Sequence, residues 1–77
     1  MRVHVNLYAN LKIYSSDGSG SLDLDLPTDA TVQAVIERLC IPPAVHAVIL
    51  VNGRRSAADT QLSEGDRMTL FPPMEGG

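Results

Sequence analysis

The stretch SLDLDLP, residues 21–27, is the clearest strand pattern in the chain. Its three leucines would face one side of a sheet and its two aspartates the other, because side chains alternate between the faces of a strand. Pro27 cannot donate to a strand ladder and marks the end of this segment. The pattern therefore requires a sheet with one apolar face, which a second layer must cover.

A second alternating stretch lies at the start of the chain, where Val3, Val5 and Leu7 are separated by polar residues. The alternation weakens through residues 8–14 and stops at SSDGSG, residues 15–20. Two strands around a Gly-rich loop predict a β-hairpin.

An amphipathic helix is predicted to begin after Thr31, whose hydroxyl can accept a hydrogen bond from a free backbone N–H as an N-cap. Pro42 and Pro43 stop the helix, because the residue before a proline is pushed toward extended geometry. The residues that form its apolar stripe, at positions i, i+3, i+4 and i+7, are Val32, Val35, Ile36 and Leu39.

Three further strands are predicted in the second half of the chain. Residues 47–51 form a nearly continuous apolar run, which is typical of an interior strand. An Asn-Gly dipeptide follows and is a strong turn signal, so residues 54–56 are expected to return as a minor strand. Residues 67–71 form the last strand, and Leu62 is expected to plug the core from the loop before it. Strands with one helix on a single face predict an α+β, two-layer domain.

Composition excludes several classes of function. A net charge of −3, with no basic cluster beyond Arg54-Arg55, lacks the electrostatic footprint of a nucleic-acid binder. No apolar run is long enough for a membrane span, so no membrane partner is expected either. A single cysteine, Cys40, cannot form an internal disulfide or a multi-cysteine zinc site, and it fits a reducing, cytoplasmic location.

The remaining polar residues predict no second site. His4 and His46 fall on different predicted strands without a carboxylate at ligand spacing, so neither a metal site nor an acid–base pair is expected. Asp23 and Asp25 have the pattern of a solvated strand face. Cys40 is expected to be a small buried hydrophobe at the helix end.

The segment FPPMEGG, residues 71–77, predicts an extended exit from the sheet. Pro72 and Pro73 fix φ near −65° and remove two hydrogen-bond donors, so they end sheet pairing. From Pro73 onward an extended chain spans about 13–18 Å. Gly76 and Gly77 have no Cβ and can thread a narrow channel.

Four segments of the chain carry a family resemblance: DATVQAVIERL (29–39), VNG (51–53), LSEGD (62–66) and LFPPMEGG (70–77). Together they resemble the MoaD/ThiS family of ubiquitin-like sulfur carriers. The double proline is more similar to the MoaD branch, the small subunits of molybdopterin synthase. Glu75, where small residues are usual, and the long segment 8–20 depart from the family pattern.

The resemblance implies a β-grasp fold, in which a mixed sheet of four to five strands has one main helix packed across it. The first strand would pair with the last. Residues 1–71 would form the domain, and residues 72–77 a flexible Gly-Gly tail.

The resemblance also implies a carrier that is not itself an enzyme and binds no cofactor. An adenylating enzyme of the MoeB/ThiF type, similar to ubiquitin-activating enzymes, would use ATP–Mg²⁺ to activate Gly77. A cysteine desulfurase or rhodanese would then supply sulfur to make a thiocarboxylate. The acceptor complex would contain a molybdopterin synthase large subunit of the MoaE type, or a thiazole synthase.

The site residues follow from the same resemblance. Gly77 is the acyl-adenylate and thiocarboxylate site. Phe71 is either ordinary core or an interface anchor, and Arg54 and Arg55 are either solvated or in contact with an acidic rim of a partner. Other open alternatives are a carrier for another sulfur metabolite, a protein modifier that joins Gly77 to lysines, and an interaction module with an incidental tail. The residues expected to thread the tail are Pro72, Pro73, Met74, Glu75 and Gly76.

Overall fold

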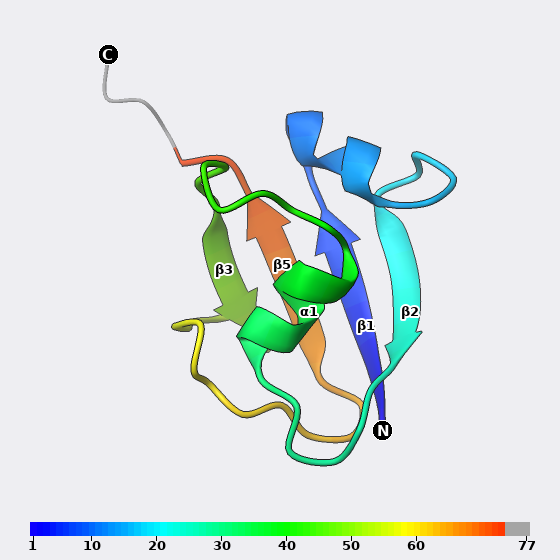
Figure 1. The fold of residues 1–77 in the computed structure, drawn as a ribbon, viewed down its shortest axis with the longest axis vertical. Coiled ribbons are helices and arrows are strands. Elements are labelled where there is room, and N and C mark those ends of the chain that lie inside the picture. The colour runs from blue at the N-terminus through cyan, green and yellow to red at the C-terminus, as the bar shows by residue number, and fades with distance from the viewer. Residues whose placement is uncertain (74–77) are drawn as a thin grey trace.

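A mixed sheet with one α-helix lying across one face forms the body of the molecule, as a computed structural model that describes residues 1–73 shows (Figure 1). The helix covers the middle strands, and no α-helix among residues 1–73 covers the opposite face, which we call the open face. The elements in chain order are β1 (Arg2–Leu7), the 3₁₀ helix η1 (Ala9–Tyr14), β2 (Ser21–Asp25), α1 (Val32–Arg38), β3 (Val48–Val51), β4 (Arg54–Arg55) and β5 (Arg67–Phe71).

The strand order is β2-β1-β5-β3-β4. β1 pairs antiparallel with β2 and parallel with β5, and β3 pairs antiparallel with both β5 and β4. The predicted hairpin and the pairing of the first strand with the last are therefore confirmed. This is the β-grasp arrangement, with the one α-helix packed across a five-stranded mixed sheet.

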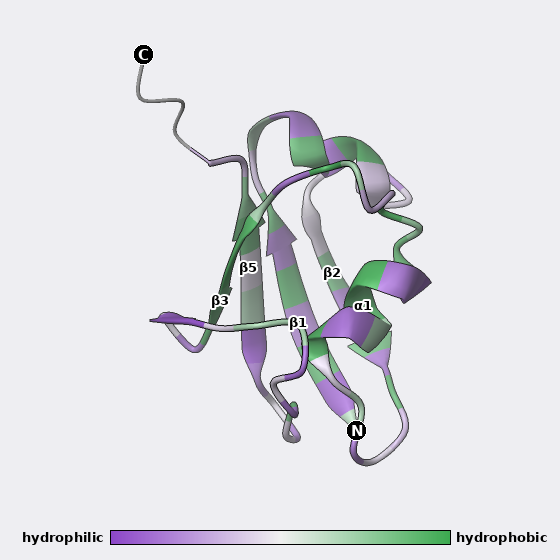
Figure 2. Cartoon of the chain, turned by 60° about the vertical axis from the view of Figure 1, so that its left-hand side comes forward, coloured by the Kyte–Doolittle hydropathy of each residue, from purple (hydrophilic) through white to green (hydrophobic). Residues whose placement is uncertain are grey.

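The core lies between α1 and the central strands, as the alternating patterns predicted. Figure 2 shows apolar residues alternating with polar ones along β1. Leu62 is buried and plugs the core from its loop, which confirms that prediction. The buried side chains of the strands and of α1 with its C-cap residue Leu39 are Val3, Val5, Leu7, Val32, Val35, Leu39, Val51, Met68 and Leu70.

The prediction that residues 47–51 form an interior strand is confirmed, because β3 lies between β5 and β4. The strand begins one residue later than predicted, at Val48, and is half-buried over most of its length. Its outer neighbour β4 pairs with Leu50 and Val51, so no strand among residues 1–73 lies beyond the first part of β3. No helix of the described residues is long and apolar enough to cross a membrane.

The start of α1 differs from the prediction in which groups accept hydrogen bonds from its first backbone N–H groups. Thr31 is the N-cap residue, but its hydroxyl makes no capping hydrogen bond. Instead, the Val32 N–H donates to the Thr60 carbonyl at 3.0 Å and the Gln33 N–H donates to the Ala58 carbonyl at 2.9 Å. The loop before β5 therefore supplies the acceptors that the side chain was expected to supply.

The end of α1 overturns the prediction for Cys40, which is exposed. Cys40 has φ +60°, and its N–H donates to the Glu37 carbonyl while the Ile41 N–H donates to the Ile36 carbonyl. These bonds make a Schellman ending, with Cys40 at the left-handed position that glycine usually fills. Ile41 turns inward and is buried in place of the cysteine.

The connection between β1 and β2 was predicted as a Gly-rich loop, and the structure shows that it contains η1. The Leu11 N–H donates to the Tyr8 carbonyl at 3.1 Å, and Leu11 is buried. After η1, the chain turns through Asp17, whose pKa is lowered chiefly because the Ser19 N–H donates a hydrogen bond to its carboxylate.

Replacing Cys40 with glycine should stabilise the protein by about 0.5–1 kcal/mol, because glycine takes positive φ without steric cost. Urea unfolding measures the change. Cys40→Ala is the control, since it removes the thiol but keeps a Cβ. A gain for alanine equal to that for glycine would contradict the Schellman assignment.

Gly20→Ala should destabilise the protein by about 2–4 kcal/mol, because Gly20 has φ +81° and an added Cβ would strike the Leu7 carbonyl oxygen and the Lys12 side chain. Gly18 also has positive φ, but no atom lies within 4 Å of an added Cβ. Gly18→Ala should therefore cost only about 1 kcal/mol in the same unfolding assay. Equal losses of unfolding free energy in the two variants would contradict the predicted clash between a Cβ at position 20 and the Leu7 carbonyl oxygen.

Candidate functional site

The site predicted from sequence begins where β5 ends. β5 stops at Phe71, and Pro72 is half-buried while Pro73 is exposed. Both prolines therefore lie beyond the last ladder pair, which joins Phe71 to Val48 on β3. The other predicted tail residues, Met74, Glu75, Gly76 and Gly77, lie outside the described residues.

Phe71 lies on the open face of the sheet. Met68 and Leu70 on the same strand are buried against the helix layer, so the alternation of the strand turns Phe71 the other way. Its ring is half-buried, with Val48 opposite on β3. An aromatic side chain is thus held at the root of the tail by a strand, which limits the freedom of its backbone.

The structure brings only one of the two predicted arginines to the face that carries Phe71. Both arginines are exposed, but Arg55 is in register with Leu50 on that face, while Arg54 is in register with buried Val51. Two strand spacings and two residues separate Arg55 from Phe71, or about 12 Å. The hydrophilic end of the β3–β4 hairpin projects from the body (Figure 2).

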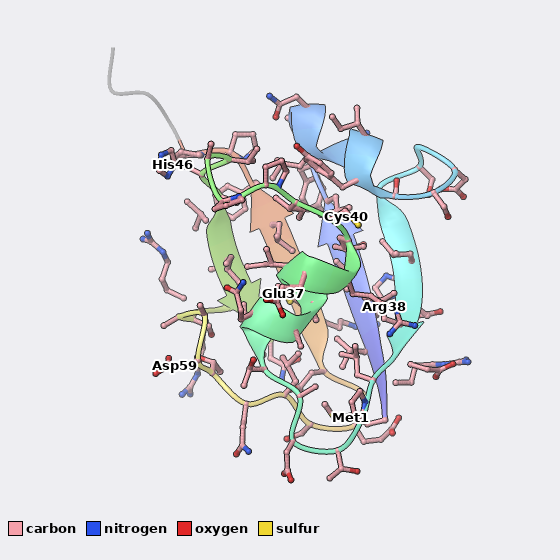
Figure 3. The ribbon with its side chains drawn as sticks, in the orientation of Figure 1. Met1, Glu37, Arg38, Cys40, His46 and Asp59 are labelled. Atoms are coloured by element: carbon pink, nitrogen blue, oxygen red, sulfur yellow. The ribbon has the colours of Figure 1, made fainter. Side chains whose placement is uncertain are left out.

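A hollow of about 490 Å³ lies beside the tail root, and sequence reasoning missed it. His46 was predicted on a strand, but it lies in the loop before β3, beside the point where the chain leaves β5 (Figure 3). We call this hollow the tail-root hollow. Its lining residues come from η1, from this loop and from the start of the tail, and they are Asn10, Leu11, Val45, His46, Pro72 and Pro73.

A histidine–carboxylate pair, which the sequence was not expected to form, lies on the open face. His4 Nδ1 lies 2.8 Å from Asp23 Oδ1, and His4 Nε2 lies 3.2 Å from both Asn6 Oδ1 and Ser21 Oγ. The antiparallel register of β1 and β2 places His4 directly opposite Asp23. The register of the predicted hairpin could therefore have indicated this pair. His4 is in register with the start of β5, roughly 13 Å along the strand from the tail root.

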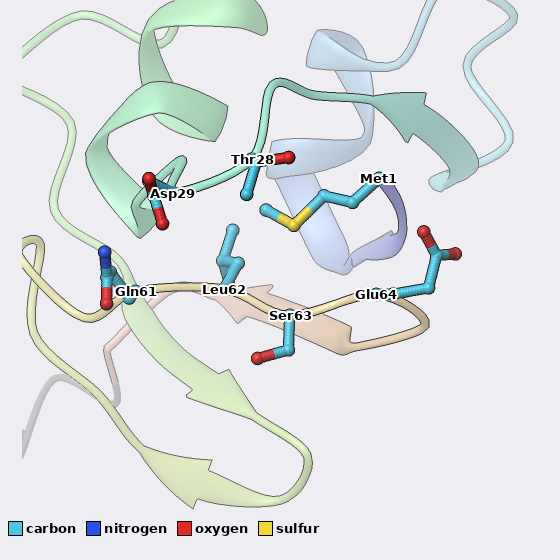
Figure 4. Close-up of a pocket in the computed structure, with 7 residues that line it drawn as sticks. All are labelled: Met1, Thr28, Asp29, Gln61, Leu62, Ser63 and Glu64. Carbon is cyan, nitrogen blue, oxygen red and sulfur yellow. The ribbon is translucent and has the colours of Figure 1, made fainter.

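A slightly larger hollow, of about 510 Å³, lies at the end of the body remote from the tail. Figure 4 shows the Met1 side chain extending into it toward Thr28 and Leu62. The Met1 ammonium donates to the Leu26 carbonyl at 2.7 Å, which ties the start of the chain to the end of β2. This hollow is similar in size to the one beside the tail root, but it lies far from the tail. We therefore do not assign it to the chemistry expected at Gly77.

Solved structures of two archaeal proteins have the same fold. The Haloferax volcanii small archaeal modifier protein 1 is 26% identical, with a TM-score of 0.80 over 95% of this chain and 98% of its own. A Pyrococcus furiosus protein described as molybdopterin converting factor subunit 1 is 26% identical, with a TM-score of 0.82 over 96% and 99% of the two chains.

A more distant structure shows the fold alone. It is a complex of subunits 1 and 2 of the molybdopterin-converting factor from Helicobacter pylori, and it is 21% identical with a TM-score of 0.64 over 100% of both chains. No curated protein sequence matches the chain.

The ThiS family model matches residues 5–77, from the middle of β1 through the Gly-Gly pair. The structural relatives include both a modifier and molybdopterin converting factors, so they identify the family without separating its branches. The chain belongs to the ThiS family, the ubiquitin-like sulfur carriers of the ThiS/MoaD type, which are small non-catalytic carriers.

Proposed function

We propose that this carrier holds sulfur as a thiocarboxylate on Gly77 and donates it in molybdopterin biosynthesis, as the small subunit of a molybdopterin synthase. The observation that carries the proposal is the end of β5, where Phe71 closes a central strand and two prolines lead directly toward Gly-Gly. The similarity to the Pyrococcus furiosus molybdopterin converting factor subunit supports the choice of pathway.

The chemistry needs a carboxylate that can reach another protein's active site. A free carboxylate is a poor acyl donor. Attack of its oxygen on the α-phosphate of ATP forms an acyl adenylate and releases pyrophosphate. A persulfide sulfur of the donor then displaces AMP and forms an acyl disulfide with the donor. A thiol attacks the donor's own sulfur in that bond, which releases the thiocarboxylate and leaves a disulfide on the donor. The carrier supplies the substrate group, while the adenylating enzyme supplies position and charge stabilisation.

Docking the tail has an entropic cost that contacts from the body must offset. Fixing the backbone of five residues costs on the order of 5–10 kcal/mol. Pro72 and Pro73 reduce this cost because their φ angles are already fixed. Phe71 is the expected anchor, since an aromatic at the centre of an interface carries a large share of its energy.

Incubation with an adenylating enzyme, ATP–Mg²⁺ and a sulfur donor should add about 16 Da to the intact protein, as sulfur replaces one oxygen. Intact-mass spectrometry measures this gain. Deleting Gly77 should abolish it, whereas Gly18→Ala should not. An unchanged mass with an enzyme that activates a known carrier would rule out the proposal.

The identity of the protein that accepts the sulfur tests which pathway the carrier serves. The thiocarboxylate form should bind a molybdopterin synthase large subunit and convert the pterin precursor to the dithiolene, with loss of the added mass. Transfer to a thiazole synthase instead would assign the carrier to thiamine biosynthesis.

A role as a protein modifier is the second candidate, and the similarity to the small archaeal modifier protein favours it. In that case the acyl adenylate would acylate lysine amines. Conjugates of high mass should then appear in lysate and disappear when Gly77 is deleted. Thiocarboxylate without conjugates would support the carrier role.

A further inference from the structure

The tail-root hollow has the chemistry of a site for an apolar side chain. Leu11 is buried in its wall and Val45 is half-buried, while the two prolines supply a further apolar surface. Asn10 and His46 are exposed and are the polar members of the lining. At about 490 Å³, the hollow falls within the size range of pockets that receive ligands.

The short tail determines what must cover this hollow. Four residues follow Pro73 up to Gly77, and they span at most about 13–14 Å when extended. An enzyme that reacts with Gly77 must therefore bring its active-site entrance against the end of the body that holds Pro73. An apolar hollow left empty within that contact would lose packing interactions on every side.

We propose that the tail-root hollow is a docking pocket for an apolar side chain of the adenylating enzyme that receives the tail. This inference rests on the proposed function. The enzyme's side chain inserts between η1, Val45 and the prolines, and so holds the exit of the tail toward the active site. η1 lies at the same end of the body as the tail root (Figure 1), and its residue Ile13 is 75% exposed.

The test uses paired charges at the mouth of the hollow. Asn10→Glu/His46→Glu should raise the KM of the carrier in pyrophosphate exchange at least tenfold and change kcat less than twofold, because a charge facing an apolar partner is desolvated without a counter-charge. The matched control is Thr28→Glu/Gln61→Glu, which adds the same charge at exposed positions in the hollow beside Met1. Its KM should stay within twofold of the unsubstituted protein.

A second variant blocks the hollow without adding charge. His46→Trp should place an aromatic ring over the opening and raise KM in the same way. Thermal unfolding of every variant within a few degrees of the unsubstituted protein verifies that the body is folded.

The outcomes separate this inference from the function on which it rests. If the unsubstituted protein is not adenylated, both are overturned. If it is adenylated and the hollow variants match the control, the docking pocket is overturned and the carrier function stands. If only transfer to the sulfur acceptor is weakened, the adenylating enzyme is the wrong occupant and the proposal fails.

Discussion

The parallel pairing of β1 with β5 is the constraint on which the rest of the structure depends. Leu7 lies in register with Leu70, so both strands end at the same side of the body. The Tyr8 N–H donates to the Leu70 carbonyl at 3.1 Å, which ties the start of η1 to the strand that leads into the tail. Because the pair is parallel, the start of the chain lies at the opposite end. The position of the tail root therefore follows from a contact between two segments at opposite ends of the sequence.

Strands with two different faces were predictable from the sequence. β5 has the predicted bounds because buried Met68 and Leu70 alternate with partly exposed neighbours. The order of pairing came from family resemblance, since alternation says which face of a strand is buried but not which strand lies beside it. η1 was missed, although Tyr8, Leu11 and Tyr14 recur at the three-residue period of a 3₁₀ helix, because so short an element gives a weak signal.

The wrong predictions concern features that depend on backbone geometry. Cys40 is apolar enough for a core, but the left-handed ending of α1 turns it outward. His4 and Asp23 are far apart in sequence, and only the hairpin register brings them to 2.8 Å. For the same reason the tail-root hollow could not be predicted, because Leu11, Val45 and Pro72 come from three separate segments.

The β-grasp body thus ends its central strand at the root of a short tail, and we propose that sulfur is carried on Gly77. Arg67 is the last basic residue, so trypsin releases residues 68–77 as one peptide. Tandem mass spectrometry of this peptide, from protein produced with its activating enzyme and sulfur donor, shows directly which residue carries the sulfur. We expect a gain of about 16 Da that is confined to the final glycine. An unmodified final glycine in this peptide would contradict the proposed carrier role.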